Sequence, residues 1–154
     1  MTAMPLWATE TATETCASAL LLGGIAAEIG ATAPRGQQAA FYRAVGARIA
    51  AIHPVDMVDD LSGLATVVNR VWLEYNCGQA QFDMVADGIL ITHSGAVRNL
   101  APVLGHATEA VMRPVLEGVY DGWLRSLGSG RDVATWTLSW SEGEVRLKHG
   151  LRGA

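Results

Sequence analysis

The chain has 154 residues, enough for one domain with a real hydrophobic core, and half of them are hydrophobic. Eleven basic and fifteen acidic residues give a formal net charge of −4, and charged residues make up 17% of the chain. This composition excludes a disordered chain and argues against nucleic acid or an anionic membrane surface as a partner. The shortage of polar residues also favours a homo-oligomer, in which apolar surface is covered.

The N-terminal residues 1–9 are predicted to form an extended arm, followed by a single α+β domain over residues 10–154. Pro5 blocks an early helix in the arm. The first helix is predicted over residues 11–30. Because its middle is apolar nearly all round, we expect it to be buried on more than one side.

The same apolar run lacks the marks of an export signal or a membrane span. No Lys or Arg precedes Arg35, and Glu10 and Glu14 occupy the place of a positive segment. The run is too short to cross a bilayer, and Glu28 interrupts its end. We therefore expect a cytoplasmic protein without membrane insertion.

Two amphipathic helices are predicted next, over residues 37–52 and 56–76. The apolar stripe of the first consists of Phe41, Val45, Ile49 and Ile52. The stripe of the second consists of Leu61, Leu64, Ala65, Val68, Trp72 and Tyr75. A tryptophan in such a stripe is expected to pack in the core.

Two β-hairpins are predicted from alternating apolar and polar residues. The first spans residues 79–93, with a tight turn at Asp87-Gly88. The second joins residues 131–140 to residues 144–149. Strands joined only by hairpins favour an antiparallel sheet, so the fold class is α+β, with helices against one sheet.

The second hairpin carries two of the five tryptophans. Trp136 and Trp140 alternate with threonine and serine, so one face of their strand is apolar and the other polar. We expect both tryptophans to share the apolar face and to belong to the core.

The segment between the hairpins is expected to organise the domain. One or two helices are predicted over residues 102–127, with Pro114 at a first helical position or at a kink. Gly118 and Gly122 lie one turn apart, which indicates that another backbone packs closely there. One apolar ladder consists of Val111, Val115, Val119 and Trp123, and a second consists of Leu116, Tyr120, Leu124 and Leu127.

Two apolar faces on one helix allow two interpretations. In the first, the segment is an ordinary core helix. In the second, it packs inward on its own subunit and outward on a partner, because two faces are more than one small core needs. The second interpretation predicts an oligomer interface at Leu116, Tyr120 and Leu124.

No catalytic residue, metal site or cofactor motif is predicted, so the chain is not expected to be an enzyme. None of the four histidines stands at metal-ligand spacing from another ligand, and there is no nucleophile elbow or phosphate loop. Trp72 and Trp123 lie in helical stripes and are expected in the core. Trp7 is the tryptophan placed where stacking on a sugar would be natural.

Several segments resemble the D-subunit family of bacterial cellulose synthase. Pro114 to Trp123 (PVLEGVYDGW) is similar to a helix motif of that family, and Arg43 to Arg48 is similar to an earlier helix. Leu61 to Trp72 and Leu90 to His93 resemble the helix and strand between them. The resemblance covers about half of the chain, whereas the N-terminal arm and the region after Gly130 depart from the family pattern.

This resemblance implies a non-catalytic accessory subunit of cellulose biosynthesis. It implies a cylindrical homo-octamer whose passages admit β-1,4-glucan chains during export, and partners among the other cellulose synthase subunits. The family's glucan contacts lie near the arm, so Met4, Leu6 and Trp7 become the predicted glucan-binding residues. The alternative is a small apolar-ligand-binding or sensor domain of the vinyl-reductase/TRAPP-like type, which resembles this order of elements.

Overall fold

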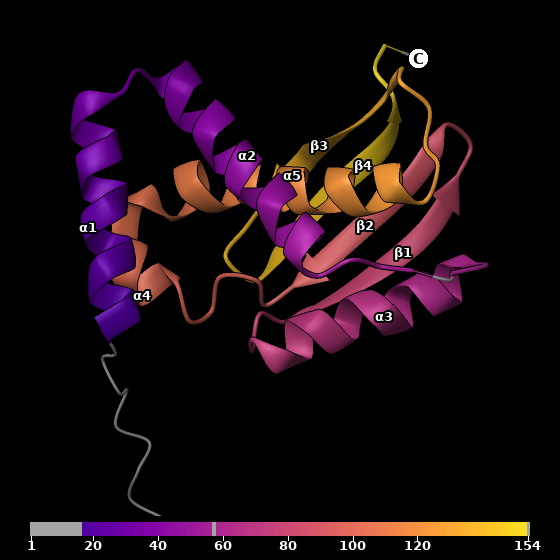
Figure 1. Ribbon diagram of the computed structural model, residues 1–154, viewed down its shortest axis with the longest axis horizontal. Coiled ribbons are helices and arrows are strands. Elements are labelled where there is room, and N and C mark those ends of the chain that lie inside the picture. Colours follow the sequence, from indigo (N-terminus) through magenta and orange to yellow (C-terminus); the bar gives the residue numbers. More distant parts are fainter. Residues whose placement is uncertain (1–16, 57, 154) are drawn as a thin grey trace, which may run out of the picture.

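The computed structural model describes residues 17–56 and 58–153 (Figure 1). The predicted arm and the first residues of the predicted first helix lie outside the described residues. The helix itself, α1, spans Ala17–Thr32 and is followed closely by α2, Arg35–Ile52. In the part of the chain that is described, no helix combines the length and apolarity that a membrane crossing needs.

The described strands form one antiparallel sheet in the order β1-β2-β4-β3, in which β1-β2 and β3-β4 are the two predicted hairpins and the β2-β4 pairing joins them. Their bounds are β1 Gln79–Val85, β2 Gly88–Ser94, β3 Val133–Trp140 and β4 Glu144–Leu151. The first turn consists of Ala86 and Asp87, one residue earlier than predicted, because Val85 pairs with Gly88. The α+β fold class is confirmed.

Helices cover one face of this sheet in two further layers (Figure 1). Helix α3, Leu61–Glu74, packs on β1, and α5, Thr108–Ser126, packs on β3 and β4. Helix α2 crosses over α5 on the side away from the sheet, and α1 lies at one end of the domain against the short helix α4, Ala101–Leu104. Asp60 caps α3, since its Oδ1 accepts a hydrogen bond from the Gly63 N–H at 2.7 Å.

The segment predicted to be helical over residues 102–127 forms two helices, and the second, α5, runs through Pro114. The segment starts as α4, Ala101–Leu104, passes through the 3-10 turn η2, Gly105–Ala107, and continues as α5. The break falls at Gly105, whose φ of +54° favours glycine. Pro114 therefore lies inside α5 and not at its first position. Inside the helix, its missing N–H leaves one helical hydrogen bond unmade.

Helices α2 and α5 cross in close backbone contact. A Cβ atom on Gly46 would lie 2.0 Å from the carbonyl oxygen of Val115, and one on Gly118 would lie 2.1 Å from the carbonyl oxygen of Arg43. No side chain fits in either place, so both helices need glycine at the crossing. Gly122 meets a methyl group of α2 in the same way. This confirms the close backbone approach predicted at Gly118, whereas the nearest atom at Gly122 belongs to the Ala50 side chain.

The opposite side of α5 packs on the sheet, so both apolar ladders are buried within one chain except at Leu127, which is 38% exposed. Tyr120 and Trp123 are almost fully buried, and their rings lie 5.8 Å apart between centroids. Trp72 of α3 packs edge-on against Trp123, at 5.3 Å. The core positions predicted for Trp72 and Trp123 are confirmed, and α5 is a central helix between α2 and the sheet.

Strand β3 lies at the sheet edge, and carboxylates from α5 accept hydrogen bonds from its free backbone groups. Asp121 Oδ1 accepts from the Thr135 N–H at 3.1 Å, and Glu117 Oε1 accepts from the Thr137 N–H at 2.9 Å. Glu117 also pairs with Arg43 of α2. Two carboxylates one helical turn apart thus fix the strand to the helix.

The prediction that Trp136 and Trp140 share a strand face is wrong, because β3 carries a β-bulge after Thr137. The extra residue shifts the alternation. Trp140 therefore pairs with the buried Val145 and packs against the core. Trp136 pairs with Lys148 and lies on the sheet face that the helices leave open.

Candidate functional site

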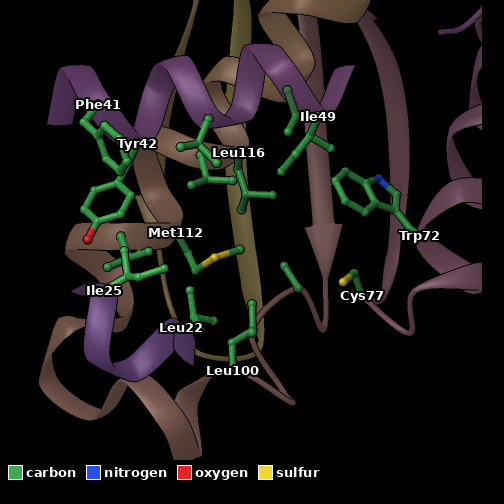
Figure 2. Close-up of a pocket in the computed structure, with 15 residues that line it drawn as sticks. Leu22, Ile25, Phe41, Tyr42, Ile49, Trp72, Cys77, Leu100, Met112 and Leu116 are labelled. Carbon is green, nitrogen blue, oxygen red and sulfur yellow. The ribbon is translucent and has the colours of Figure 1, made fainter. Parts of the chain in front are cut away.

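An apolar cleft of about 350 Å³ opens between α1, α2 and α5 (Figure 2). The loop that follows β2 and the turn after α3 close its far end. Its walls include Leu22 and Ile25 from α1, Phe41 and Ile49 from α2, and Met112 and Leu116 from α5. The side chains that line it are mostly aliphatic or aromatic.

This cleft is lined by three residues of the predicted α2 stripe, Phe41, Val45 and Ile49, but not by Ile52. Phe41 is 47% exposed and Ile52 is 64% exposed, whereas the side of α2 that meets α5 consists of Tyr42, Gly46 and Ala50. A face built from glycine and alanine gives no hydrophobic signal in the sequence. The direction in which α2 packs was therefore not readable from periodicity.

The cleft has the chemistry of an apolar binding site and not of a reaction centre. Burial raises the pKa of the Tyr42 phenol and of the Cys77 thiol, so both groups stay protonated at neutral pH. A protonated thiol is a poor nucleophile. Across the described residues, no charged side chain lines the cleft. The site therefore suits a hydrocarbon chain or an apolar part of a partner.

The structure places only some of the predicted site residues. Met4, Leu6 and Trp7 lie outside the described residues. Leu116 and Tyr120 are almost completely buried in the chain's own core, and Leu124 is 6% exposed. The predicted interface role of these three stays a prediction, but their contacts here are intramolecular.

Exposed apolar surface gathers instead on α1. Leu20 is 78% exposed, Leu21 65% and Ile25 43%, and they belong to a shallow hollow along that helix. The sequence predicted burial of α1 on more than one side, whereas among residues 17–56 and 58–153 α1 meets α4 and, less extensively, α2, and it lines the cleft. The signal for this surface was the apolar character of α1 all round.

The buried His93 belongs to a closed hydrogen-bond chain. Trp72 Nε1 donates to the Tyr120 hydroxyl at 3.2 Å, and that hydroxyl lies 2.8 Å from His93 Nδ1. His93 Nε2 lies 2.7 Å from the carbonyl oxygen of Cys77, which can only accept, so Nε2 carries the proton and Nδ1 accepts from Tyr120. Burial lowers the pKa of His93 to about 4, and the bond to Cys77 opposes this. His93 is thus a neutral structural residue.

Metal-binding chemistry finds no support in residues 17–56 and 58–153. No three side chains among histidine, cysteine, aspartate and glutamate come together there as metal ligands. The acidic pair on α5, Glu117 and Asp121, is occupied with the free edge of β3.

Comparison with known proteins identifies the family. No curated protein sequence matches the chain. The family model for the D subunit of cellulose synthase matches residues 8–150, which is nearly the whole chain. The resemblance seen in the sequence covered the segment from Arg43 to Trp123. The family match is longer at both ends, since it begins before α1 and ends in β4. The chain therefore belongs to the cellulose synthase D-subunit family.

Proposed function

We propose that this chain is a non-catalytic accessory subunit of bacterial cellulose biosynthesis, whose ring-shaped homo-oligomer guides glucan chains during export and crystalline assembly. The observation that carries the proposal is the family match over residues 8–150. The polar side chains of His93, Glu117 and Asp121 agree with it, since all three are engaged in holding the fold.

The oligomer is supported by the surface of α1. A row of leucine and isoleucine side chains on one helix, exposed in the single chain, is the kind of surface that a second copy covers. We propose that α1 contributes to contacts between copies and that the complete assembly is an octamer. The role proposed for Leu116, Tyr120 and Leu124 is then indirect. Their packing holds α5 in place, α5 holds α2, and these helices position the interface.

The glucan path is proposed to involve the N-terminal arm. Trp7 offers a flat aromatic face, and Met4 and Leu6 offer apolar contacts, which suit the apolar faces of glucose rings. The other cellulose synthase subunits are the proposed protein partners, at the cytoplasmic side of the membrane.

Complementation of a cellulose-producing bacterium that lacks its own member of this family tests the function. The native chain should restore the yield and crystalline order of cellulose. Leu20→Glu combined with Leu21→Glu should fail to restore them, because charges on α1 prevent its burial between copies. The matched control is Leu73→Glu on α3, a leucine that is 80% exposed on another surface, and it should restore function. Restoration by the α1 double variant would contradict the role of α1 in assembly.

The apolar cleft favours a second candidate function, the binding of a small apolar ligand. An uncharged cavity of about 350 Å³ falls within the size range of ligand pockets. Organic extraction and mass spectrometry of the purified protein test it. A stoichiometric lipid in a dimeric protein would favour this candidate, and an extract without lipid from a large ring would favour the accessory subunit.

A further inference from the structure

A second cleft, of about 570 Å³, lies at the other end of the domain. It opens between the start of α3, the turn that follows α5, and the inner face of β2 and β4. Leu61, Leu64, Ile89 and Leu124 give it aliphatic walls, and His149 and Ser129 line it as polar residues. Asp59 and Asp60 lie at its rim and are exposed. It shares no lining residue with the apolar cleft described above.

The protonation of His149 follows from its neighbours. The Thr135 hydroxyl has one proton and lies 3.2 Å from Asp121 Oδ1 and 2.8 Å from His149 Nδ1. A carboxylate can only accept, so Thr135 donates to Asp121 and must accept from His149. Nδ1 therefore carries the ring proton, and Nε2 presents a bare lone pair.

That lone pair has no partner in the described part of the chain. His149 is 4% exposed, and its Nε2 is buried without a hydrogen bond. The Ser129 hydroxyl, on the turn after α5, is also buried without a partner. Buried polar groups are nearly always paired, so two unpaired ones at a single cleft indicate that a ligand supplies the missing bonds.

The groups at the cleft select the class of ligand. Nε2 needs a donor, and burial lowers the pKa of His149, so the ring stays neutral and offers no charge to an anion. The carboxylates of Asp59 and Asp60 at the rim also repel anions. An ammonium group would lose its hydration at the buried Nε2, which costs far more than burying a hydroxyl. A neutral ligand with several hydroxyl groups and an apolar face fits best.

We propose that this second cleft binds a sugar ring of a β-1,4-glucan, with one ring hydroxyl donating to His149 Nε2 and another bonding to Ser129 Oγ. The aliphatic walls then face the C–H surface of the ring. The assignment of the sugar as glucose rests on the proposed function of the chain. It adds a glucan contact on the folded domain, apart from the one proposed for the arm.

Calorimetric titration of the full chain with cellotetraose tests the proposal. His149→Phe should weaken binding by at least about fivefold, and Ser129→Ala by about threefold, as expected for lost neutral hydrogen bonds. Ser129→Ala changes only a turn, so it reports on binding even if the histidine variant is poorly folded. The control His106→Phe replaces an exposed histidine that does not line this cleft, and it should bind as the native chain does.

Two outcomes would overturn the proposal, and only the second would also contradict the proposed glucan function. Native affinity in both His149→Phe and Ser129→Ala, with loss of binding in Trp7→Ala, would overturn the second cleft as a glucan site and leave the glucan function standing. Absence of any cellotetraose binding by the native chain would overturn the cleft and the proposed glucan function together.

Discussion

The two central strands of the sheet each carry a buried histidine, His93 on β2 and His149 on β4. The two residues differ in how completely their ring nitrogens are hydrogen-bonded. Both side chains are buried, and both face the helices. Both ring nitrogens of His93 are bonded, one to Tyr120 and one to Cys77. His149 bonds through Nδ1 alone and leaves Nε2 without a partner beside an open cleft.

The difference separates a structural polar group from a candidate binding group. A closed chain of hydrogen bonds offers a ligand nothing, because each donor and acceptor is already used. An open chain keeps one atom available at a cost in stability, and such costs persist at functional sites. Burial alone would not have distinguished the two residues.

The largest effect is expected for His93→Phe. The ring keeps its apolar neighbours, but the Tyr120 hydroxyl loses its acceptor, keeping only the bond from Trp72, and the Cys77 carbonyl loses its donor. The loss of these two hydrogen bonds, which leaves one donor and one acceptor unsatisfied, should lower the free energy of unfolding by roughly 3–5 kcal/mol. Chemical denaturation at pH 7 measures it. A loss below about 1 kcal/mol would show that the closed chain is not structural.

Acid should destabilise the native protein through the same residue. The pKa of His93 is about 4 in the folded chain and ordinarily 6.5, so the unfolded chain binds the proton first as the pH falls. The stabilising effect of neutral His93 is complete above pH 6.5, declines between pH 6.5 and 4, and amounts to about 3 kcal/mol. His149 acts in the same direction. Denaturation curves from pH 7 to 4 measure this loss, and His93→Gln should flatten the profile.

The smallest effect on stability is expected for His149→Phe. The substitution removes one hydrogen bond, but it also removes the unpaired Nε2, and Thr135 can still donate to Asp121. The free energy of unfolding should change by less than about 1 kcal/mol. The same denaturation assay checks it beside His93→Phe. Equal losses in the two variants would erase the distinction between a closed and an open hydrogen-bond chain.

The sequence predicted much of the fold. The order of helices and hairpins, the core positions of Trp72 and Trp123, and the close backbone packing at Gly118 followed from periodicity, turn residues and glycine placement. These signals depend on residues close together in the sequence, and the structure agrees with the predictions made from them. The family was also readable from the motif that ends at Trp123, and the match over residues 8–150 confirms it.

What the sequence missed depends on contacts between distant segments. The bulge in β3 put Trp140 on the core face and left Trp136 on the open face, and nothing in the strand itself signalled an extra residue. The role of Glu117 and Asp121 became visible only with β3 placed beside them. The protonation of His149, and with it the unpaired Nε2, follows from contacts with Thr135 and Asp121, which lie on other elements. Pairing of side chains across elements is a property of the folded chain.

Native mass by light scattering on a sizing column tests the proposed function most directly. Eight copies of the 16.3-kDa chain have a mass of about 130 kDa, and a closed ring should give one monodisperse species near that value. Leu20→Glu combined with Leu21→Glu should reduce the mass while leaving the fold intact, since both side chains are exposed in the single chain. A native protein that stays monomeric at every concentration would contradict the ring, and a stable dimer would favour the binding of an apolar ligand instead.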